Sequence, residues 1–366
     1  MTTTPELYYQ ISLKLIPGIG DVLIKNLISY CGGVEAIFKE RKSKLLKIPG
    51  IGGVLANNIA TFSNFDLAEK EMIFIEKHQI KAYFYLDEAY PYRLRDLQDA
   101  PTLLFGLGNF DLNPTRLIGI VGTRKASEYG RAFTQQLVQD LKEHNIEVIS
   151  GLALGIDGIA HKACIEHQIS NIGVLAHGLD RIYPSQHQQL AKKMLLCGGL
   201  LTEFTSGTNP DRENFPKRNR IVAGMSDVLV VPETAIKGGA RITAEIAHSY
   251  NRDIMVLPGR VSDYYSLGCN YLIRDHKASM ITCADDLIQL MGWEKSKKQA
   301  PKPDLFSLLT KEENTLIEYI RNKGKCNVDL MAFELNTDPG TLALRLLELE
   351  FGGYVRPLPG KSYELV

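Results

Sequence analysis

Between residues 116 and 291, short apolar runs alternate with segments of helical periodicity. The runs lie at residues 117–122, 146–151, 171–178, 199–204, 227–233, 253–259 and 278–282. They are continuously apolar rather than alternating, which is typical of strands that are covered on both faces. The pattern therefore predicts an α/β fold with a Rossmann-like, mainly parallel sheet in a domain that spans residues 80–292.

A bridging segment leads into the predicted sheet. Residues 82–86 and 102–109 have the apolar character of short strands, and the polar stretch YPYRLRDLQDAP lies between them. Because this segment runs directly into the first buried strand, we expect it to cover one edge of the sheet.

An internal repeat organises the N-terminal region. The segment LKLIPGIGDVLIKNLISY at residues 13–30 is echoed by LLKIPGIGGVLANNIATF at residues 45–62, an offset of 32 residues. In each copy, proline and glycine end one helix and begin the next, which predicts a helical domain of two helix-hairpin-helix repeats over residues 1–79. Such turns can offer N–H groups to a DNA phosphate, but few lysines or arginines lie in them, so a packing or protein-docking module is an equal alternative.

The C-terminal part reads as a small separate domain. Residues 293–304 form a lysine- and proline-bearing linker without apolar periodicity. In residues 305–366, Thr310 and Glu313 form a capping box for one helix, residues 328–335 form a second, Pro339 begins a third, and residues 352–366 form a hairpin. This order predicts a winged helix. Its third helix carries one arginine, Arg345, so protein docking or weak DNA contact is favoured over sequence-specific reading of DNA.

Composition limits the possible partners and the compartment. The 366 residues contain 42 Lys and Arg and 42 Asp and Glu, so any nucleic-acid site must be a local patch. The six cysteines form neither a C-x-x-C pair nor a metal-ligand cluster with histidine, which is typical of reduced intracellular thiols. No targeting signal is present and the apolar runs are too short to span a bilayer, so we expect a cytoplasmic protein without a membrane partner.

Glycine-containing turns follow three of the predicted strands, at residues 122–124, 151–157 and 237–243. The carboxyl ends of parallel strands meet at one edge of a sheet, so these turns are expected to converge. In the first turn, Gly122 allows close backbone approach, the next helix offers free N–H groups, and Arg124 adds a guanidinium. We predict a phosphate-binding edge, with a tight turn that binds nothing as the alternative.

A basic segment precedes the strand at residues 227–233. Here Phe215 and Asn219 lie among four cations, which are Arg212, Lys217, Arg218 and Arg220. Cations that follow a phosphate backbone and an aromatic ring that stacks on bases suit single-stranded nucleic acid. The alternative is a solvated basic helix start with Phe215 in the core. The sequence has no P-loop motif and no metal-ligand set, so we expect a non-catalytic protein with no cofactor and no metal.

Several motifs, in order, resemble the bacterial DNA-processing protein A (DprA/Smf) family over nearly the whole chain. They include VGTRKASEYG, SGLALGIDGIAH, FPKRNRIVAGMSD, GGARITAEIA and LGCNYLIRDHKA. The resemblance implies a helical N-terminal domain, a Rossmann-like domain that binds single-stranded DNA without base specificity, and a winged-helix domain. It also implies a homodimer that protects incoming DNA and loads the RecA recombinase onto it during natural transformation.

The resemblance also implies which residues bind DNA. Phosphate would be held by Gly122, Thr123, Arg124 and Ser127, and the pocket would be completed by Gly238, Gly239 and Thr243. Backbone and base contacts would come from Phe215, Lys217, Arg218 and Arg220. Three further DNA contacts are predicted from the strand-end turns and the basic segment alone, namely Gly151, Arg212 and Asn219. One departure concerns Arg241, which stands where many members have leucine in a serine-glycine-serine-leucine run; it either strengthens anion binding or points away.

Two other function classes are weighed against this one. Gly238, Gly239, Thr243 and Glu245 resemble part of the PGGxGTxxE motif of phosphoribohydrolases, but the preceding proline is missing and Arg241 replaces the inner glycine. A transcription factor would use the winged helix, against which the acidic, leucine-rich third helix argues. The histidines His161, His177 and His187 lack a paired acid at catalytic spacing and are interpreted as packing or edge residues, the first two also as minor pocket contributors.

Overall fold

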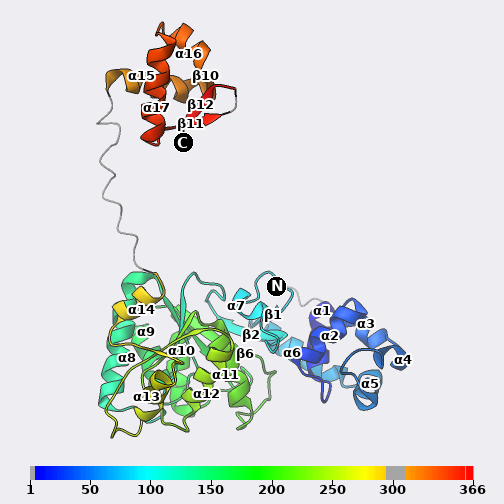
Figure 1. Cartoon of the computed structure of the whole chain (residues 1–366). Coiled ribbons are helices and arrows are strands. Elements are labelled where there is room, and N and C mark those ends of the chain that lie inside the picture. Colours follow the sequence, from blue (N-terminus) through cyan, green and yellow to red (C-terminus); the bar gives the residue numbers. More distant parts are fainter. Residues whose placement is uncertain (1–4, 294–309, 359, 366) are drawn as a thin grey trace. The chain divides into compact units, whose positions relative to one another are not determined.

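The computed structural model describes residues 5–293, 310–358 and 360–365. These residues belong to two compact units, Met1–Trp293 and Glu294–Val366 (Figure 1). The predicted linker at residues 293–304 lies outside the described residues except for Trp293.

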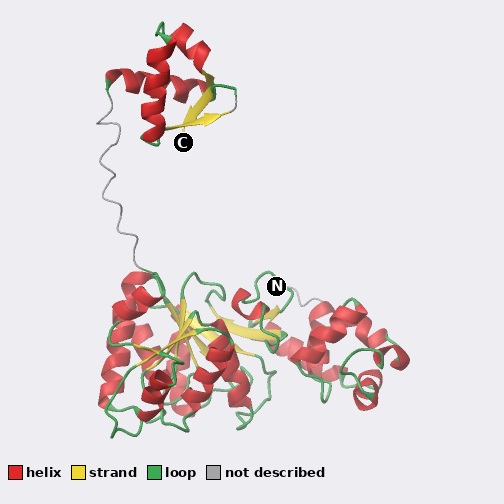
Figure 2. Ribbon diagram, viewed as in Figure 1, coloured by secondary structure: helices red, strands yellow, loops and turns green. Residues whose placement is uncertain are grey.

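A nine-stranded sheet lies at the centre of the first unit (Figure 2). Its spatial order is β1-β2-β6-β5-β4-β3-β7-β8-β9, and the seven strands from β6 to β9 in this order are parallel. The strands are β1 (Lys81–Phe84), β2 (Leu103–Gly108), β3 (Leu117–Ile120), β4 (Glu147–Ser150), β5 (Asn171–Val174), β6 (Gly198–Thr202), β7 (Val228–Val231), β8 (Asp253–Val256) and β9 (Ser279–Met280). The predicted α/β class with a mainly parallel sheet is therefore confirmed.

The bridging segment does more than cover an edge, because it adds two strands to the sheet. β2 pairs antiparallel with β6, and β1 pairs antiparallel with β2. Between them lies the short helix α7 (Tyr92–Arg95). Its buried Arg93 forms a two-pronged ion pair with Asp227, at 2.7 and 2.8 Å, just before β7. The segment is thus held both to the sheet edge and to its centre.

Helices cover both faces of the sheet, and adjacent strand residues point to opposite faces. In β7, Val228 and Val230 pack into one core, whereas Leu229 and Val231 pack into the other. This double coverage explains the continuous apolar runs of the sequence. The helices of this region are α8 (Glu128–Leu141), α9 (Ile156–His167), α10 (Gln188–Cys197), α11 (Asn214–Met225), α12 (Gly239–Ser249), α13 (Leu267–Arg274) and α14 (Ala284–Leu290), with short 3-10 turns η1 (Lys142–His144) and η2 (Ser185–His187).

The chain order of the strands creates a switch point between β3 and β7. From β3 the chain proceeds through β4, β5 and β6 on one side, whereas β7 is followed by β8 and β9 on the other side. The connections after β3 and β7 therefore leave in opposite directions, and a crevice opens at the carboxyl ends of these strands. In open α/β sheets, this crevice is where ligands bind.

The N-terminal helices form two hairpins that pack reciprocally. A Cβ on Gly18 would lie 2.9 Å from Leu55, and a Cβ on Gly50 would lie 3.0 Å from Leu23. Both glycines have positive φ, +80° and +85°. Each contact pairs one hairpin turn with the other hairpin's helix, and the two contacts are related by the 32-residue offset of the repeat. The helices are α1 (Pro5–Lys14), α2 (Asp21–Cys31), α3 (Val34–Lys39), α4 (Lys42–Leu45), α5 (Gly53–Ala60) and α6 (Phe65–Lys77).

These helices share a hydrophobic core with the edge of the sheet. Phe84 of β1 and the buried Leu103 and Phe105 of β2 pack in the same cluster as Ile11 and Ile75 from the helices. The expected boundary between residues 79 and 80 therefore lies inside one compact unit. Helices and sheet edge bury each other's apolar surface, which fixes their relative position.

The second unit has three helices and a three-stranded sheet with the order β10-β12-β11. Its elements are α15 (Lys311–Lys323), β10 (Cys326–Asn327), α16 (Val328–Glu334), α17 (Pro339–Phe351), β11 (Val355–Leu358) and β12 (Ser362–Leu365). Thr310 and Glu313 form the expected capping box, and Asp338 caps the helix that begins with Pro339. The sequence does not predict β10, because a strand of two residues is too short to show an apolar periodicity. The three helices and the β11–β12 hairpin lie in the chain order from which the sequence predicts a winged helix.

Candidate functional site

A cavity of about 400 Å³ opens at the switch point, beyond the carboxyl ends of β3 and β7. Ten of the fifteen residues predicted to bind DNA line it, although they come from four separate segments of the chain. They are Gly122, Thr123, Arg124, Gly151, Phe215, Arg218, Asn219, Gly238, Gly239 and Thr243. The sheet therefore brings the predicted turns together as the strand-end rule requires.

Glycines allow the strand-end turns to pack against one another. A Cβ on Gly122 would lie 2.4 Å from Ile156, and a Cβ on Gly155 would lie 2.1 Å from the Thr123 carbonyl oxygen. Gly155 also has φ +79°, a conformation that other residues rarely adopt. Ile156 N–H donates to the Thr123 oxygen at 3.2 Å. The turn after β3 and the turn before α9 therefore form one rigid wall of the cavity.

The N-terminus of α12 faces the cavity without a side-chain cap. Gly238 is the N-cap residue of this 11-residue helix, and it supplies no side-chain cap within the described structure. A Cβ on Gly239 would meet no heavy atom within 4 Å, so the space beside it is open. Free N–H groups and the positive end of a helix dipole favour an anion at this place.

An exposed cation and an aromatic ring stand together at the cavity. The Cζ atom of Arg124 lies 5.4 Å from the centroid of the Phe215 ring. Arg124 is exposed and has no ion-pair partner among the residues that the structure describes. Tyr183 also contacts Phe215 edge to face, at 6.1 Å between ring centroids. Because no described residue forms an ion pair with it, the Arg124 guanidinium is available for a phosphate, while the half-buried Phe215 ring is available for a base.

Arg218 has a different role from Arg124. Its side chain is only 5% exposed, and one terminal nitrogen donates to the carbonyl oxygens of Gly151 and Val174, the latter at 2.7 Å. Its Nε donates to the Asn219 side chain at 3.0 Å. Arg218 thus ties together the ends of β4 and β5 at the lining of the cavity.

Asp157 balances this buried cation. It is 5% exposed, and its carboxylate accepts weak hydrogen bonds from the N–H groups of Gly122 and Ala153, both at 3.4 Å. Burial raises the pKa of Asp157, while the charge of Arg218 opposes this shift. Two guanidinium groups and one carboxylate line the cavity, so one positive charge is in excess at neutral pH.

Ser127 does not face this cavity, because an internal carboxylate occupies the N-terminus of α8. Ser127 N–H donates to Glu233 at 2.9 Å, its hydroxyl donates to the same carboxylate, and it also caps Gly130 N–H. Glu233 is 3% exposed. The N–H groups of Ser127 and Gly130 are therefore bonded within the protein and are not free for a phosphate at this helix start.

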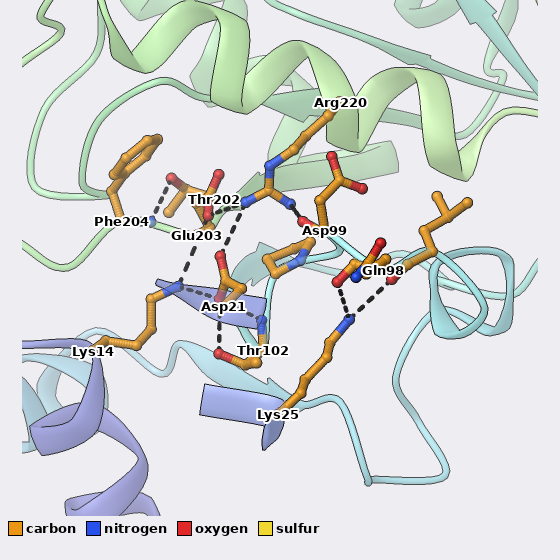
Figure 3. A network of polar contacts seen from close by, with 12 residues as sticks. Lys14, Asp21, Lys25, Gln98, Asp99, Thr102, Thr202, Glu203, Phe204 and Arg220 are labelled. Atoms are coloured by element: carbon orange, nitrogen blue, oxygen red, sulfur yellow. Dashed lines mark hydrogen bonds and ion pairs between the residues drawn. The ribbon is translucent and has the colours of Figure 1, made fainter. Parts of the chain in front are cut away.

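Arg220 and Lys217 lie on the other side of α11, at a second cavity of about 390 Å³. Arg220 donates to Glu203 at 2.6 Å, to Asp21 at 3.2 Å and to the Asp99 carbonyl oxygen at 2.6 Å (Figure 3). Arg220 therefore lies at a different cavity from Arg124, although the sequence predicts that both bind DNA. Residues 217 and 220 are three positions apart on a helix and share a face, whereas residues 215, 218 and 219 share another.

The remaining two predicted residues also lie outside the cavity lining. Arg241 turns back along its own helix, donating to the Ile236 oxygen at 3.1 Å and lying 3.7 Å from Glu245. Of the two readings of this residue, the structure favours the one in which it points away. Arg212 is exposed in the turn just before α11.

Glu245, the residue of the phosphoribohydrolase alternative, is engaged elsewhere. Its carboxylate accepts from Lys277 at 2.5 Å and is not part of the cavity lining. Within the described part of the chain, no three His, Cys, Asp or Glu side chains gather where they could hold a metal ion. None of the described helices is long and apolar enough to cross a membrane.

The three histidines are buried. His161 bonds Asn171 at 2.9 Å, and burial lowers its pKa to about 4, so its imidazole is neutral at pH 7. His187 bonds the Leu152 oxygen at 2.9 Å. Burial likewise lowers the pKa of His177, which lines a small hollow beside Arg124 and Tyr183. Of the three, only His177 lies at the edge of the site.

Tyr264 and Tyr265 line the cavity but were not predicted. They follow β8 in the segment LPGRVSDYYSLG. The rule that selected the turns after β3, β4 and β7 would also select this turn, since β8 ends at the same edge. The missing signal was charge, because the segment carries one arginine and one aspartate and has no glycine-rich anion motif.

The comparisons with known proteins agree on one family. A family model described as DNA recombination-mediator protein A matches residues 81–292. The chain is 34% identical to the protein Smf of Synechocystis over 294 residues, which are 78% of this chain and 73% of that protein. The structure is similar to that of DNA processing protein A from Streptococcus pneumoniae, with a TM-score of 0.69 at 30% identity over 79% of this chain and 98% of that one.

A second solved structure is similar over a shorter part. It is that of DNA processing protein A from Helicobacter pylori, a protein with a unique single-stranded DNA binding mode. The TM-score is 0.53 at 28% identity, and the match covers 58% of this chain and 95% of that one.

Proposed function

Since this chain belongs to the DNA recombination-mediator protein A family, we propose that it binds single-stranded DNA at the cavity beyond β3 and β7. The observation that carries the proposal is the pairing of the exposed Arg124 with the Phe215 ring at this cavity. A phosphate would bind between Arg124 and the free N–H groups of α12, and the adjacent base would stack on Phe215.

The chemistry of the cavity suits an unpaired strand of any sequence. Backbone N–H groups and a guanidinium recognise phosphate, which is the same in every nucleotide, and an aromatic face accepts every base. A base inside a duplex cannot reach Phe215 without leaving its stack. The relative from Helicobacter pylori, which binds single-stranded DNA, supports this choice of ligand. We include the exposed Arg212 as a phosphate contact outside the cavity.

We further propose that the protein works as a homodimer in DNA recombination and delivers the bound strand to the RecA recombinase in the cytoplasm, during natural transformation. The support is the description of the matching family as recombination mediators. In this proposal the protein supplies binding and no catalysis. Incubation with nucleoside monophosphates should release no free base, and sedimentation should give twice the mass of the 40.8 kDa chain.

The proposed site is tested by replacing Arg124 with alanine. Binding of fluorescent oligo-dT would be followed by anisotropy across a salt series, with duplex of the same length in parallel. Arg124→Ala should weaken oligo-dT binding about tenfold and lower the slope of log affinity against log salt by about 0.7, the value for one lost contact to a single strand.

A matched control removes the same charge elsewhere. Arg274 is exposed at the end of α13 and pairs with its neighbour Asp275. Arg274→Ala should leave affinity and salt slope nearly unchanged. Equal losses in the two variants would show that only the overall charge matters, and a wild-type protein that prefers duplex would refute the proposal.

A further inference from the structure

A neighbouring cavity of about 880 Å³ lies directly beside the proposed DNA site. Tyr264 and Tyr265 line both cavities, so the two are continuous along this pair of residues. Tyr129 of α8 and Arg260 line this neighbouring cavity and are not part of the lining of the proposed DNA site. The turn after β8 therefore joins the cavity beyond β3 and β7 to a second, larger cavity on the same surface.

The turn that carries these tyrosines is anchored at its base. The Asn270 side chain donates to the Gly259 oxygen at 2.9 Å and accepts from Gly259 N–H at 3.2 Å. A Cβ on Gly259 would lie 2.1 Å from the Ser266 hydroxyl, so only glycine allows this approach. Tyr129 hydroxyl donates to the Pro258 oxygen at 3.1 Å, which joins α8 to the same turn. The rings are therefore presented from fixed backbone.

The rings of Tyr264 and Tyr129 are largely exposed to solvent, so they contribute little to the packing of the core. Tyr264 is 65% exposed and Tyr129 is 54% exposed. Tyr264 and Tyr265 are in edge-to-face contact, with ring centroids 5.1 Å apart. An aromatic ring that stays in solvent contributes less to stability than a buried one. Beside a ligand cavity, its exposed face is available for stacking.

The charges around the rings favour one orientation of a bound DNA strand, with its phosphates toward Arg260. Arg260 is exposed and has no ion-pair partner within the described residues. The two carboxylates of the lining are Glu233, which is occupied by Ser127, and Asp263, whose oxygen lies 3.4 Å from the Ser262 hydroxyl. Because a carboxylate repels phosphate but not the face of a base, bases would lie over the tyrosines and phosphates along Arg260.

We propose that Tyr264, with Tyr265 and Tyr129, forms a second base-stacking subsite that continues the path of single-stranded DNA from the Phe215 cavity. The proposal rests on the proposed function and adds a specific segment to it. In this arrangement the first cavity holds the nucleotide bound by Arg124, and the tyrosines hold bases farther along the same strand. The subsite discriminates against duplex, because paired bases do not expose their faces.

Oligonucleotide length separates the two subsites. The full-length protein would be titrated with oligo-dT of about 4 and about 16 nucleotides, which bracket the usual footprint of a small single-strand site. Tyr264→Ala should weaken binding of the long oligonucleotide fivefold or more and weaken the short one clearly less, because Tyr264 borders the first cavity but stacks on bases beyond it. Tyr264→Phe keeps the ring and should bind like the wild type.

Two controls make the result interpretable. Val261 is 85% exposed on the same turn and lines neither cavity, so Val261→Ala should have no effect on binding. Long oligonucleotides that carry bromodeoxyuridine at one position would be photo-cross-linked and mapped by mass spectrometry. Cross-links to Tyr264, Tyr265 or Tyr129 support the subsite.

The outcomes distinguish this subsite from the site itself. If Arg124→Ala weakens both oligonucleotides while Tyr264→Ala weakens neither and no tyrosine cross-links, the subsite is refuted and the proposed function stands. Equal losses for both lengths in Tyr264→Ala would also refute it, because the tyrosine would then act within the first cavity. A wild-type protein that binds neither oligonucleotide overturns both proposals.

Discussion

At the residue scale, the two arginines at the cavity do different work despite their equal charge. Arg124 is exposed and unpaired among the described residues, so its guanidinium is available to a ligand. Arg218 is buried and donates to two strand-end carbonyls, so its guanidinium is committed to the fold. Burial lowers the pKa of Arg218, but from a value so high that the group stays charged. Loss of the Arg124 side chain should therefore weaken DNA binding and leave stability nearly unchanged, whereas loss of the Arg218 side chain should lower stability.

Replacement of Arg218 by methionine should destabilise the protein. The change leaves Asp157 as a buried charge without its cation and leaves the Gly151 and Val174 carbonyl groups short of a donor, which costs about 3 kcal/mol or more. Arg124→Met should change the unfolding free energy by less than about 0.5 kcal/mol, as for other exposed sites. Thermal unfolding of both variants measures the difference. Equal melting temperatures would contradict the structural role given to Arg218.

At the element scale, the repeat at the N-terminus determines how two hairpins pack. Each turn places a glycine of positive φ against a leucine of the other hairpin, Gly18 against Leu55 and Gly50 against Leu23. The Asn58 side chain also donates to the Pro17 oxygen at 3.0 Å, across the same junction. These contacts favour the interpretation of the hairpins as a packing module, while their exposed residues leave the DNA-contact alternative open.

Alanine at Gly18 or Gly50 should destabilise the helical region to a similar extent. A left-handed backbone costs an L-residue about 1–2 kcal/mol, and the added Cβ must also displace the facing leucine. Gly53 is the matched control, because it lies in the first turn of α5 with open space around it. Gly53→Ala should be neutral or slightly stabilising. Urea unfolding checks all three, and a loss for only one of the two turns would argue against the reciprocal packing.

At the scale of the first unit, the network in Figure 3 joins the N-terminal helices to the sheet region. Arg220 of α11 lies between Asp21 of α2 and Glu203, and Lys14 lies 3.5 Å from Asp21. Burial would raise the pKa of Asp21, but Lys14, the Thr102 hydrogen bonds and Arg220 together lower it. For Glu203, burial dominates and raises the pKa, against the same two cations. Charge pairing therefore adds to the shared apolar core in holding the unit together.

Asp21→Asn should lower the unfolding free energy at pH 7 by about 1–3 kcal/mol, because two cations and the Thr102 donors lose their anion. The folded-state pKa of Asp21 lies below its unfolded value, so its stabilisation is present above the ordinary aspartate pKa of about 4 and is lost as pH falls through the folded value. Urea unfolding should give a constant difference from wild type between neutral pH and pH ~5, and a smaller one below pH ~4.

The exposed Asp96 provides the control for this pH series. Asp96→Asn removes the same charge from the bridging segment and should change the unfolding free energy by less than about 0.5 kcal/mol at every pH. A deficit of Asp21→Asn that stays constant through the acidic range, or that Asp96→Asn reproduces, would show that the network does not stabilise the unit through the Asp21 charge.

The positions of the strands and hairpins, and the sheet edge at which their turns meet, follow from the amino-acid sequence alone. Continuous apolar runs gave each parallel strand, the 32-residue echo gave the paired hairpins, and the strand-end rule gave the position of Gly122, Gly151 and Gly238 at one cavity. These properties depend on the local periodicity of apolar residues and on the shared direction of parallel strands. Both can be inferred from one amino-acid sequence.

The contacts of the polar side chains, by contrast, depend on how the whole chain folds. Arg220 meets Asp21, which is 199 positions away, and Ser127 meets Glu233, which is 106 positions away. The sequence shows that these residues are charged or polar, but the partner depends on which face of a helix meets which segment. Tyr264 was overlooked for the same reason, because a ring on a turn becomes a binding surface only when the fold leaves it exposed beside a cavity.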